Sequence, residues 1–473
     1  MLFSSNIFLF VFLPGVILIY YGLLKWSRLL QNIFLCLASL FFYAWGEPKF
    51  VLVMMLSIAV NWTGGLLISS AQEANKHMRA KMLLGIDVFF NVLIIFIFKY
   101  LMFAVNNINS LLGSDIKVPE IALPIGISFF TFQAISYVVD IYRGNGEAQK
   151  HILNVGLYIS FFPQLIAGPI VRYETIAEQI HNRRETLDDF CDGIRRFIIG
   201  FCKKILLANN LALVADKAYE LVGQGDLSAA MAWLGAIAYT LQIFYDFSGY
   251  SDMAIGLGRM FGFHFLENFN YPYISRSVTE FWRRWHISLG TWFRDYVYIP
   301  IGGSRVNSKS RQIFNLFVVW LCTGIWHGAN WTFIFWGLMY FLLLVFERYS
   351  NLLKAEGRGI NIMKCIYTMF FVIMGWILFR ADSLLQAASY YKACFGVSAG
   401  LFDDVFIEYA RQNMTYLGAG ILFATPIVPY IGMKLKPSII RDLLYTACLS
   451  ALFIASISFL VKGSYNPFIY FNF

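Results

Sequence analysis

The chain contains too few charged residues to be a soluble protein. Asp, Glu, Lys and Arg together make up 14% of its 473 residues, whereas soluble domains contain about a quarter. Hydrophobic residues account for 59% of the chain and aromatic residues for 18%. A water-exposed surface cannot be built from this composition, so a soluble globular fold is excluded.

The chain also lacks the patterns of several common functional sites. Its seven cysteines are scattered singly, with no pair at zinc or redox spacing, so we expect neither a metal site nor a disulfide framework. No Lys-Ser/Thr follows the glycine pairs, which excludes a phosphate loop. We also expect no hydrolase-type serine nucleophile. The net charge of +9 indicates membrane topology before it indicates nucleic-acid binding.

The hydrophobic residues occur in long runs. A helix that crosses about 30 Å of hydrocarbon needs roughly 20 residues, and several runs reach or approach that length. Examples are Asn6 to Leu24, Val51 to Ser69, Lys81 to Phe98, Ile121 to Val139 and Tyr367 to Phe379. We therefore predict an all-α polytopic membrane protein with about ten transmembrane spans.

The 37 Lys and Arg residues predict the orientation of these spans. Cytoplasmic loops collect Lys and Arg, and most of them fall inside if the N-terminus lies outside. Two such basic stretches are Arg143 to Lys204 and Arg259 to Arg311. The first hydrophobic run is expected to be a retained span and not a signal peptide. A signal peptide carries basic residues before its hydrophobic run, whereas the first cation of this chain, Lys25, follows the run.

Two segments depart from the pattern of simple spans. Tyr158 to Arg172 is apolar but short and broken by prolines. Broken backbone at membrane depth is tolerated only inside protein or beside a water-filled cavity, so we predict a re-entrant segment. Glu174 to Lys204 carries apolar residues on one face and basic residues on the other, which predicts an interfacial helix.

The region from Asp246 to Trp336 contains most of the 12 tryptophans, together with many Arg, Gly and Asn residues. No stretch in it before Ile313 is expected to span a bilayer. We predict N-terminal spans over residues 1–120, a catalytic core over 121–346 and C-terminal spans over 347–473. Four later spans are expected, roughly at Ala230 to Phe247, Ile362 to Phe379, Tyr416 to Ile431 and Leu443 to Leu460.

His327 is the first candidate for chemistry. The stretch Ile313 to Phe346 is too long for one span, and its glycine-flanked centre predicts two half-helices with His327 at the turn. An ionisable residue at membrane depth is costly and by default functional. An imidazole can take a proton from a hydroxyl and pass it to a leaving thiolate. The alternative is a buried histidine that only hydrogen-bonds neighbouring helices.

His286 is the second candidate. It lies in Thr279 to Gly290, which predicts one helix at the cytoplasmic interface with Arg283 and Arg284 beside an apolar face. These arginines would either reach lipid headgroups or bind the phosphates of an anionic donor such as coenzyme A. Both alternatives stay open. Nearby acids could orient an imidazole, although pairing with cations is expected for most: Asp246, Asp252, Glu267, Glu280 and Asp295.

Several motifs resemble those of membrane-bound O-acyltransferases. Phe281 to Leu289 followed by Trp292 to Gly303 is similar to the family signature, and Gly324 to Ala329 resembles its histidine motif. Other stretches resemble the bacterial alginate O-acetylation branch of the family: Phe41 to Pro48, Leu123 to Arg143, Gln164 to Arg172, Tyr245 to Ala254 and Pro467 to Phe471.

The resemblance implies a multi-helix fold with re-entrant and interfacial helices around a central histidine-containing tunnel, in the bacterial cytoplasmic (inner) membrane. It implies that His327 and His286 are catalytic. The residues expected to bind the donor are Arg283, Arg284, Arg294, Trp285 and Trp326. Acetyl-CoA would be the donor substrate, with no cofactor and no metal. The expected partners are membrane lipid and extracytoplasmic polysaccharide-acetylation proteins, with no nucleic acid.

The function expected from the resemblance is transfer of an acetyl group to an extracytoplasmic polysaccharide such as alginate. The acceptor could be a sugar or a Ser or Tyr of a partner protein, and a covalent acetyl-histidine is a variant. One alternative is D-alanyl transfer to teichoic acid from a carrier protein. Another is a transporter, although no inverted repeat is apparent.

Overall fold

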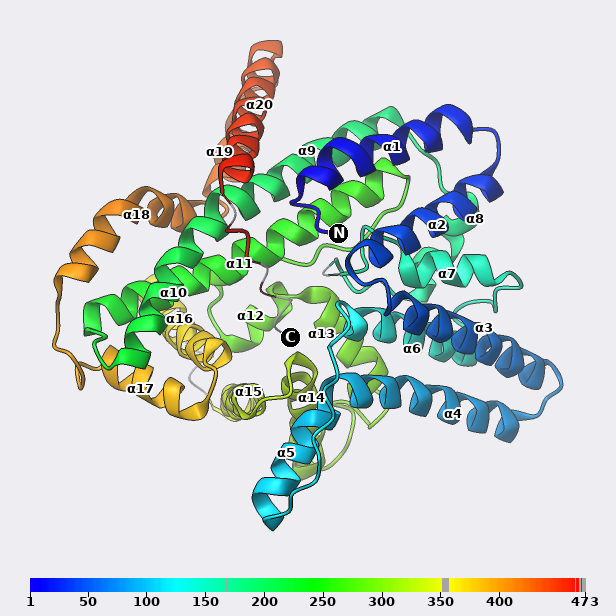
Figure 1. The fold of residues 1–473 in the computed structure, drawn as a ribbon, viewed down its shortest axis with the longest axis horizontal. Coiled ribbons are helices and arrows are strands. Elements are labelled where there is room, and N and C mark those ends of the chain that lie inside the picture. The colour runs from blue at the N-terminus through cyan, green and yellow to red at the C-terminus, as the bar shows by residue number, and fades with distance from the viewer. Residues whose placement is uncertain (167, 351–356, 464, 468, 470–473) are drawn as a thin grey trace. The chain divides into compact units, whose positions relative to one another are not determined.

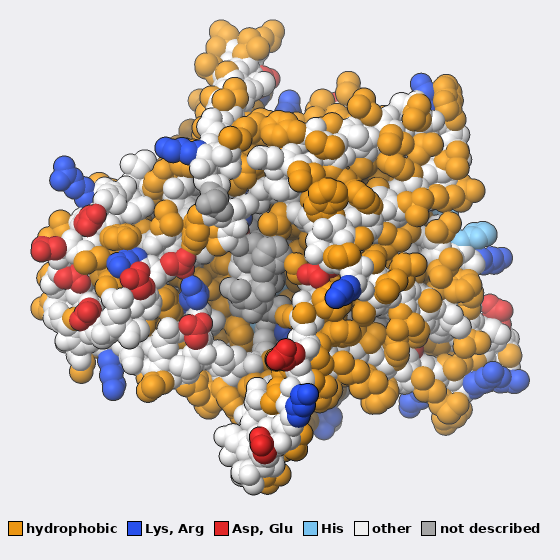
Figure 2. All heavy atoms as spheres, viewed as in Figure 1, with side chains coloured by type: hydrophobic (Ala, Val, Ile, Leu, Met, Phe, Trp, Pro, Cys, Tyr) orange, Lys and Arg blue, Asp and Glu red, His pale blue; other side chains and the backbone are white. Residues whose placement is uncertain are grey.

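The computed structural model describes residues 1–166, 168–350, 357–463, 465–467 and 469. Every regular element within these ranges is a helix, and no strand occurs among them (Figure 1). Hydrophobic side chains cover most of the face shown in Figure 2. The prediction of an all-α membrane protein is confirmed.

Seven helical segments in the described chain are long and apolar enough to cross a membrane. They are α2 (Arg28–Gly46), α3 (Val51–Glu73), α4 to α5 (His77–Leu112), α9 to α10 (Leu187–Gln224), α15 (Trp331–Tyr349), α16 (Arg358–Arg380) and α20 (Ile439–Lys462). The pair α18 (Asp404–Phe423) and α19 (Ile427–Lys434), bent by 63°, would make an eighth. The protein is therefore multi-pass, but the count of about ten spans is not reached.

The remaining helices are shorter or more polar. The first hydrophobic run forms a shorter apolar helix, Phe8–Leu23, which contains α1 (Leu13–Ile17). The others are α6 (Ile127–Arg143), α7 (Ile152–Ser160), α8 (Tyr173–Asn182), α11 (Ala229–Met260), α12 (Val278–Arg284), α13 (Ile287–Phe293), α14 (Lys309–His327) and α17 (Leu384–Cys394).

The chain forms two compact units. The first comprises Met1–Phe197 and Ser251–Leu266, and the second comprises Ile198–Tyr250 and Glu267–Phe473. In the first unit α3, α4 and α6 pack against one another, and α2 packs on α7. A polar contact joins α3 to α4, because Asn91 of α4 donates to Asn61 of α3 at 2.9 Å. Asn91 also donates to Asp87 of its own helix at 2.9 Å.

The first unit confirms one predicted break and corrects one predicted helix. Helix α7 ends at Ser160, and the described residues between it and Arg172 form turns and extended chain; a re-entrant path through the membrane stays a prediction. A single interfacial helix over Glu174 to Lys204 is wrong, because the backbone becomes extended at Arg183. The buried guanidinium of Arg183 donates to the Ile180 carbonyl at 3.0 Å and to the Tyr20 hydroxyl at 3.1 Å, which holds this turn.

Helix α11, whose residues up to Tyr250 belong to the second unit, is longer than predicted. The span expected to end at Phe247 continues as helix to Met260. The polar Asp246 inside it is tolerated because Lys204 lies 2.6 Å away and both side chains are only 2% exposed. Opposite charges that neutralise each other in this way can be buried. The helix therefore does not end where the sequence becomes polar.

Helices α14 and α15 form an antiparallel pair, as the ring contact of Phe317 with Phe341 at 5.5 Å and that of Trp320 with Tyr340 at 5.6 Å show. The predicted break at His327 is confirmed, since α14 ends there. The prediction of half-helices is wrong: each helix has 19 residues, about 28 Å at 1.5 Å per residue.

The close crossing of α14 and α15 depends on Gly324 and Gly337. A Cβ atom at Gly324 would lie 2.6 Å from the Phe333 carbonyl oxygen, and one at Gly337 would lie 2.5 Å from that of Trp320. We expect Gly324→Ala to destabilise the protein by about 1–3 kcal/mol, because the helices must separate. Gly223→Ala is the control, since nothing lies within 4 Å of a Cβ there. Thermal unfolding in detergent measures both, and equal midpoints would contradict the expectation.

The C-terminal spans are predicted in part. Helices α16 and α20 coincide with the expected runs. The span predicted over Tyr416 to Ile431 is not one continuous helix, because it contains the break between α18 and α19. Pro426 lies at this break, and proline cannot donate the backbone hydrogen bond that a continuous helix requires.

Candidate active site

The segment around His286 is two short helices and not one. Helix α12 ends at Arg284, Trp285 is extended, and His286 has φ +46° and ψ +53° before α13 begins. The predicted continuous helix over Thr279 to Gly290 is therefore wrong. The turn is held from Asn268, whose backbone carbonyl accepts from the Ile287 amide at 3.0 Å.

Glu347 of α15 holds the N-terminal end of α12. Its carboxylate accepts from the backbone amides of Val278 at 2.6 Å and Thr279 at 2.8 Å, and from the Thr279 hydroxyl at 2.6 Å. A carboxylate at this position is stabilised by the helix dipole and satisfies amides that have no partner within the helix. These bonds connect α12 to the α14–α15 pair.

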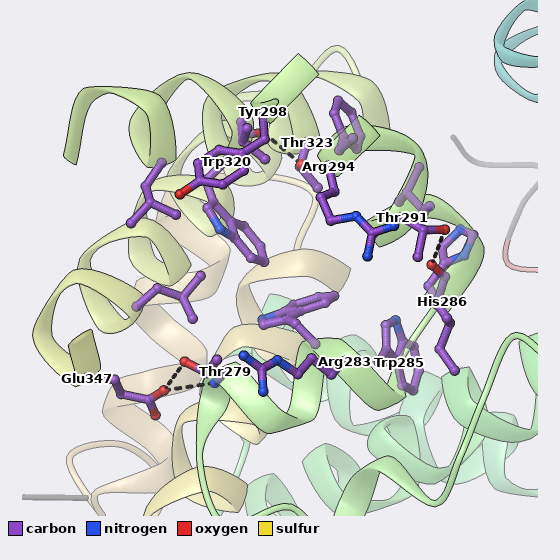
Figure 3. A pocket seen from close by; sticks show the side chains of 18 of the residues that line it. Thr279, Arg283, Trp285, His286, Thr291, Arg294, Tyr298, Trp320, Thr323 and Glu347 are labelled. Carbon is purple, nitrogen blue, oxygen red and sulfur yellow. Dashed lines mark hydrogen bonds between the residues drawn. The ribbon is translucent and has the colours of Figure 1, made fainter. Parts of the chain in front are cut away.

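A cavity of about 1020 Å³ lies between these helices (Figure 3). Its wall contains three arginines and one carboxylate, and the carboxylate is that of Glu347. The polar and aromatic side chains that line it include Arg283, Arg294, Arg348, Glu347, His286, Trp282, Trp285, Trp320 and Tyr298. The carboxylate of Glu347 is already engaged by hydrogen bonds from α12, and the arginines outnumber it in the wall.

The predicted arginines differ in how they are engaged. Arg283 is exposed, and no ion pair joins it to another described residue. Arg294 forms two hydrogen bonds to Asp295, at 2.7 and 3.0 Å. In Figure 3 both guanidinium groups point into the cavity, from two different walls. Arg284 is not among the lining residues and pairs instead with Glu280 at 2.9 Å.

The acids near the site pair with cations, as expected. Glu280 and Asp295 pair with Arg284 and Arg294. The other ion pairs are Asp246 with Lys204 and Asp252 with Arg196. The imidazole of His286 is instead oriented by an amide.

His286 is 2% exposed and lies in the wall of the cavity. Its Nδ1 atom is 3.1 Å from Oδ1 of Asn268, and its ring meets Phe247 edge-on at 4.5 Å. His286 lies outside the candidate membrane spans. Burial lowers its pKa from 6.5 to about 3, because a charged imidazole loses its hydration there. The ring is therefore neutral at physiological pH.

His327, the last residue of α14, is 7% exposed and lies in an aromatic enclosure. Its ring contacts Trp336 at 4.9 Å and Phe379 at 5.0 Å, both edge-on. The indole of Trp326 contacts both candidate histidines, with centroid distances of 4.9 Å to His327 and 6.1 Å to His286. The structure thus brings the two histidines to one indole, although His327 is not among the lining residues of the cavity.

Comparison with known proteins shows the family of the chain. The model of the membrane-bound O-acyltransferase family matches residues 146–385, which contain both histidines and every predicted donor-binding residue. The chain belongs to the membrane-bound O-acyltransferase family. It is therefore an enzyme that transfers acyl groups, and the family predicted from the motifs is confirmed.

Two similar proteins match the whole chain, and a third matches about half of it. The chain is 40% identical to the probable alginate O-acetylase AlgI of Pseudomonas putida, over 100% of both chains. It is 34% identical to the peptidoglycan O-acetyltransferase of Helicobacter pylori, over 100% of this chain and 98% of that protein. The teichoic acid D-alanyltransferase of Bacillus subtilis is 27% identical over 54% of this chain and 68% of its own length.

A Gly-x-Ser-x-Gly pattern at Gly396 to Gly400 does not mark a second acyltransferase site. Ser398 lies between α17 and α18, and its hydroxyl donates to the Leu227 carbonyl at 2.6 Å. A nucleophile elbow requires a strand before the serine, and α17 is a helix. No group of His, Cys, Asp and Glu in the described chain could hold a metal ion.

Two residues of this acyltransferase site were not predicted. Asn268 contacts His286, and Glu347 holds α12, but neither lies in the motifs that resemble the family. Asn268 precedes His286 by 18 positions and Glu347 follows Val278 by 69. No periodicity or spacing in the sequence indicates such pairs, because they form only through the tertiary fold.

Proposed function

We propose that this acyltransferase takes an acetyl group from cytoplasmic acetyl-CoA and passes it across the membrane for O-acetylation of an extracytoplasmic polysaccharide such as alginate. The observation that carries the proposal is the arginine-lined cavity with His286 in its wall, in a chain similar over its full length to a probable alginate O-acetylase. The similarity to a D-alanyltransferase is lower and covers about half of the chain.

The chemistry of the cavity supports a donor with phosphate groups. Guanidinium groups bind phosphates through charge-assisted hydrogen bonds, and Arg283, Arg294 and Arg348 all line this space. Its volume of about 1020 Å³ is at the upper end of ordinary ligand pockets, as a molecule the size of acetyl-CoA requires. Trp285 in the same wall would pack against the acyl-bearing arm. Trp326, also expected to bind the donor, is not among the lining residues and contacts the two histidines instead.

The proposed reaction requires a proton acceptor. His327 would take the proton of the acceptor hydroxyl, with His286 assisting, as that oxygen bonds to the thioester carbonyl carbon. The carbon–sulfur bond then breaks, and the proton passes to the departing thiolate to give free CoA. General-base catalysis of this kind contributes about 10²- to 10⁴-fold in rate.

The proposed topology follows the distribution of positive charge. An extracytoplasmic N-terminus puts most Lys and Arg residues inside, where acetyl-CoA is available, in the bacterial inner membrane. Polymer handling would then belong to extracytoplasmic partner proteins, which receive the acetyl group as an ester on a sugar or on a Ser or Tyr side chain.

Removing the Arg283 side chain should weaken donor binding. We expect Arg283→Ala to raise the KM for acetyl-CoA about tenfold or more with little change in kcat, because hydrogen bonds to charged groups are worth about 1.5–3 kcal/mol. Steady-state kinetics in proteoliposomes measures both constants. Arg276→Ala is the control, since Arg276 is exposed and lies outside the cavity wall. Equal KM values for Arg283→Ala and the wild type would contradict phosphate binding here.

D-alanyl transfer from a carrier protein is the alternative to be tested beside acetyl transfer from acetyl-CoA. Capture of an acyl carrier protein by the purified chain, with no turnover of acetyl-CoA, would favour that alternative. Turnover of acetyl-CoA without a carrier would exclude it. A transporter is not supported, because the chain belongs to an acyltransferase family.

A further inference from the structure

Asn268 is buried at 1% exposure and contacts the His286 turn at several points. Its side-chain Oδ1 accepts from the Ser288 backbone amide at 3.2 Å and from the Ser288 hydroxyl at 2.9 Å. The same Oδ1 lies 3.1 Å from Nδ1 of His286. Its backbone carbonyl accepts from the Ile287 amide at 3.0 Å. One residue thus holds the three consecutive residues 286–288.

These contacts determine which nitrogen of His286 carries the proton. The two ends of an Asn amide are hard to tell apart, and the hydrogen-bond network must assign them. A backbone amide can only donate, so the Asn268 atom that faces the Ser288 amide is the oxygen. An oxygen can only accept, so the 3.1 Å contact is a hydrogen bond when Nδ1 of His286 carries the proton and donates it. The Ser288 hydroxyl lies 3.4 Å from Nδ1, but it already donates to the same Asn268 oxygen at the shorter distance of 2.9 Å.

The other ring nitrogen of His286, Nε2, then bears a lone pair. It is buried and makes no hydrogen bond to any residue that the structure describes. In this tautomer Nε2 can accept a proton or a hydrogen bond, and it can donate one only after it has been protonated. The ring is also held by its left-handed backbone, φ +46°, which non-glycine residues seldom adopt.

We propose that Asn268 is a positioning residue that locks His286 in the Nδ1–H tautomer and keeps its Nε2 available to accept a hydrogen bond or a proton while it assists His327. This inference rests on the proposed catalytic role of His286. It assigns His286 the part of an acceptor and excludes it as a donor that stabilises a developing oxyanion in the resting enzyme. Partners that orient metal-ligating histidines change activity about 10- to 100-fold when replaced, and we expect an effect of that size for Asn268.

The direct test is ¹⁵N nuclear magnetic resonance of the full chain labelled at histidine, in nanodiscs. The His286 signals are assigned by comparison with His286→Asn. We expect a protonated Nδ1 and an unprotonated Nε2 in the wild type. A protonated Nε2 would overturn the proposal. This measurement needs no turnover, so it tests the tautomer of His286 even if the proposed function is wrong.

Kinetics of Asn268 variants supply the second test. Asn268→Leu keeps the volume but cannot accept, so we expect kcat to fall about 10- to 100-fold with less than a twofold change in the KM for acetyl-CoA. Asn268→Asp keeps the acceptor and should recover most of kcat. Asn270→Ala, two positions along and exposed, is the matched control and should behave as wild type. An unchanged kcat in Asn268→Leu would overturn the proposal.

The pH profile of Asn268→Asp separates positioning from folding. The only cause of the low pKa of His286 is burial, and a carboxylate beside Nδ1 would favour the charged imidazolium and raise that pKa. An acceptor must be neutral, so activity should be lost as pH falls through the raised pKa. We therefore expect the acid limb of kcat to move to higher pH in Asn268→Asp, and an unshifted limb would overturn the proposal. Full activity of His286→Asn would instead refute the proposed catalytic role of His286 while the tautomer result stands.

Discussion

His327→Ala is expected to lower acetyl transfer by about 10²- to 10⁴-fold, the usual contribution of a general base. His327 ends α14 in an aromatic enclosure of Trp326, Trp336 and Phe379. An ionisable group in such surroundings costs free energy, and its presence there therefore indicates a function. The measurement is acetylation of the exopolymer in cells that carry the variant as their only copy, with membrane abundance checked by immunoblot.

His264→Ala is the matched control for this experiment, because the His264 side chain is 52% exposed and lies outside the cavity wall. It should acetylate the polymer as the wild type does. Full acetylation by His327→Ala would show that this histidine only packs between helices. Loss in both variants would point to a general effect on membrane insertion and would also contradict the assignment.

His286→Asn is expected to lower kcat by about 10²-fold or more, with the protein still folded. His286 has a left-handed backbone, which Asn adopts more readily than other residues. His286→Ala removes the same imidazole but puts a less suitable residue in this turn, at a cost of about 1–2 kcal/mol. We therefore expect equal losses of activity in both variants and a lower unfolding midpoint only for His286→Ala.

Initial rates with purified protein and thermal unfolding in the same detergent distinguish these effects. An active His286→Asn beside an inactive His286→Ala would mean that the backbone turn, and not the imidazole, is what the reaction needs. His286 would then not be a catalytic residue, and the proposed role of His327 would be unaffected.

The membrane fold could be predicted from composition, because hydrophobic runs in a chain with few charges have no other stable arrangement. The end of α14 at His327 could also be predicted, since Gly328 follows it directly. The number of membrane spans could not be predicted from the sequence. The run from Ile121 to Val139 only overlaps α6, which begins at Ile127, ends at Arg143 and has 17 residues. The span over Tyr416 to Ile431 is divided at Pro426.

The site could be predicted only as a set of residues. Arg283 and Arg284 are adjacent in sequence, and no pattern distinguishes the one that lines the cavity from the one that pairs with Glu280. The break between α12 and α13 depends on Asn268, which lies 18 positions away. Local propensity does not contain such tertiary hydrogen bonds, so one continuous helix was predicted.

The most direct test of the central claim is transfer from radiolabelled acetyl-CoA by the purified chain in liposomes, with wild type and His327→Ala side by side. We predict that the wild type releases CoA or labels itself or an added acceptor, and that the variant does neither. Consumption of acetyl-CoA at equal rates by both proteins would contradict His327 as the proton acceptor. No consumption by the wild type, even with its extracytoplasmic partners added, would contradict acetyl-CoA as the donor.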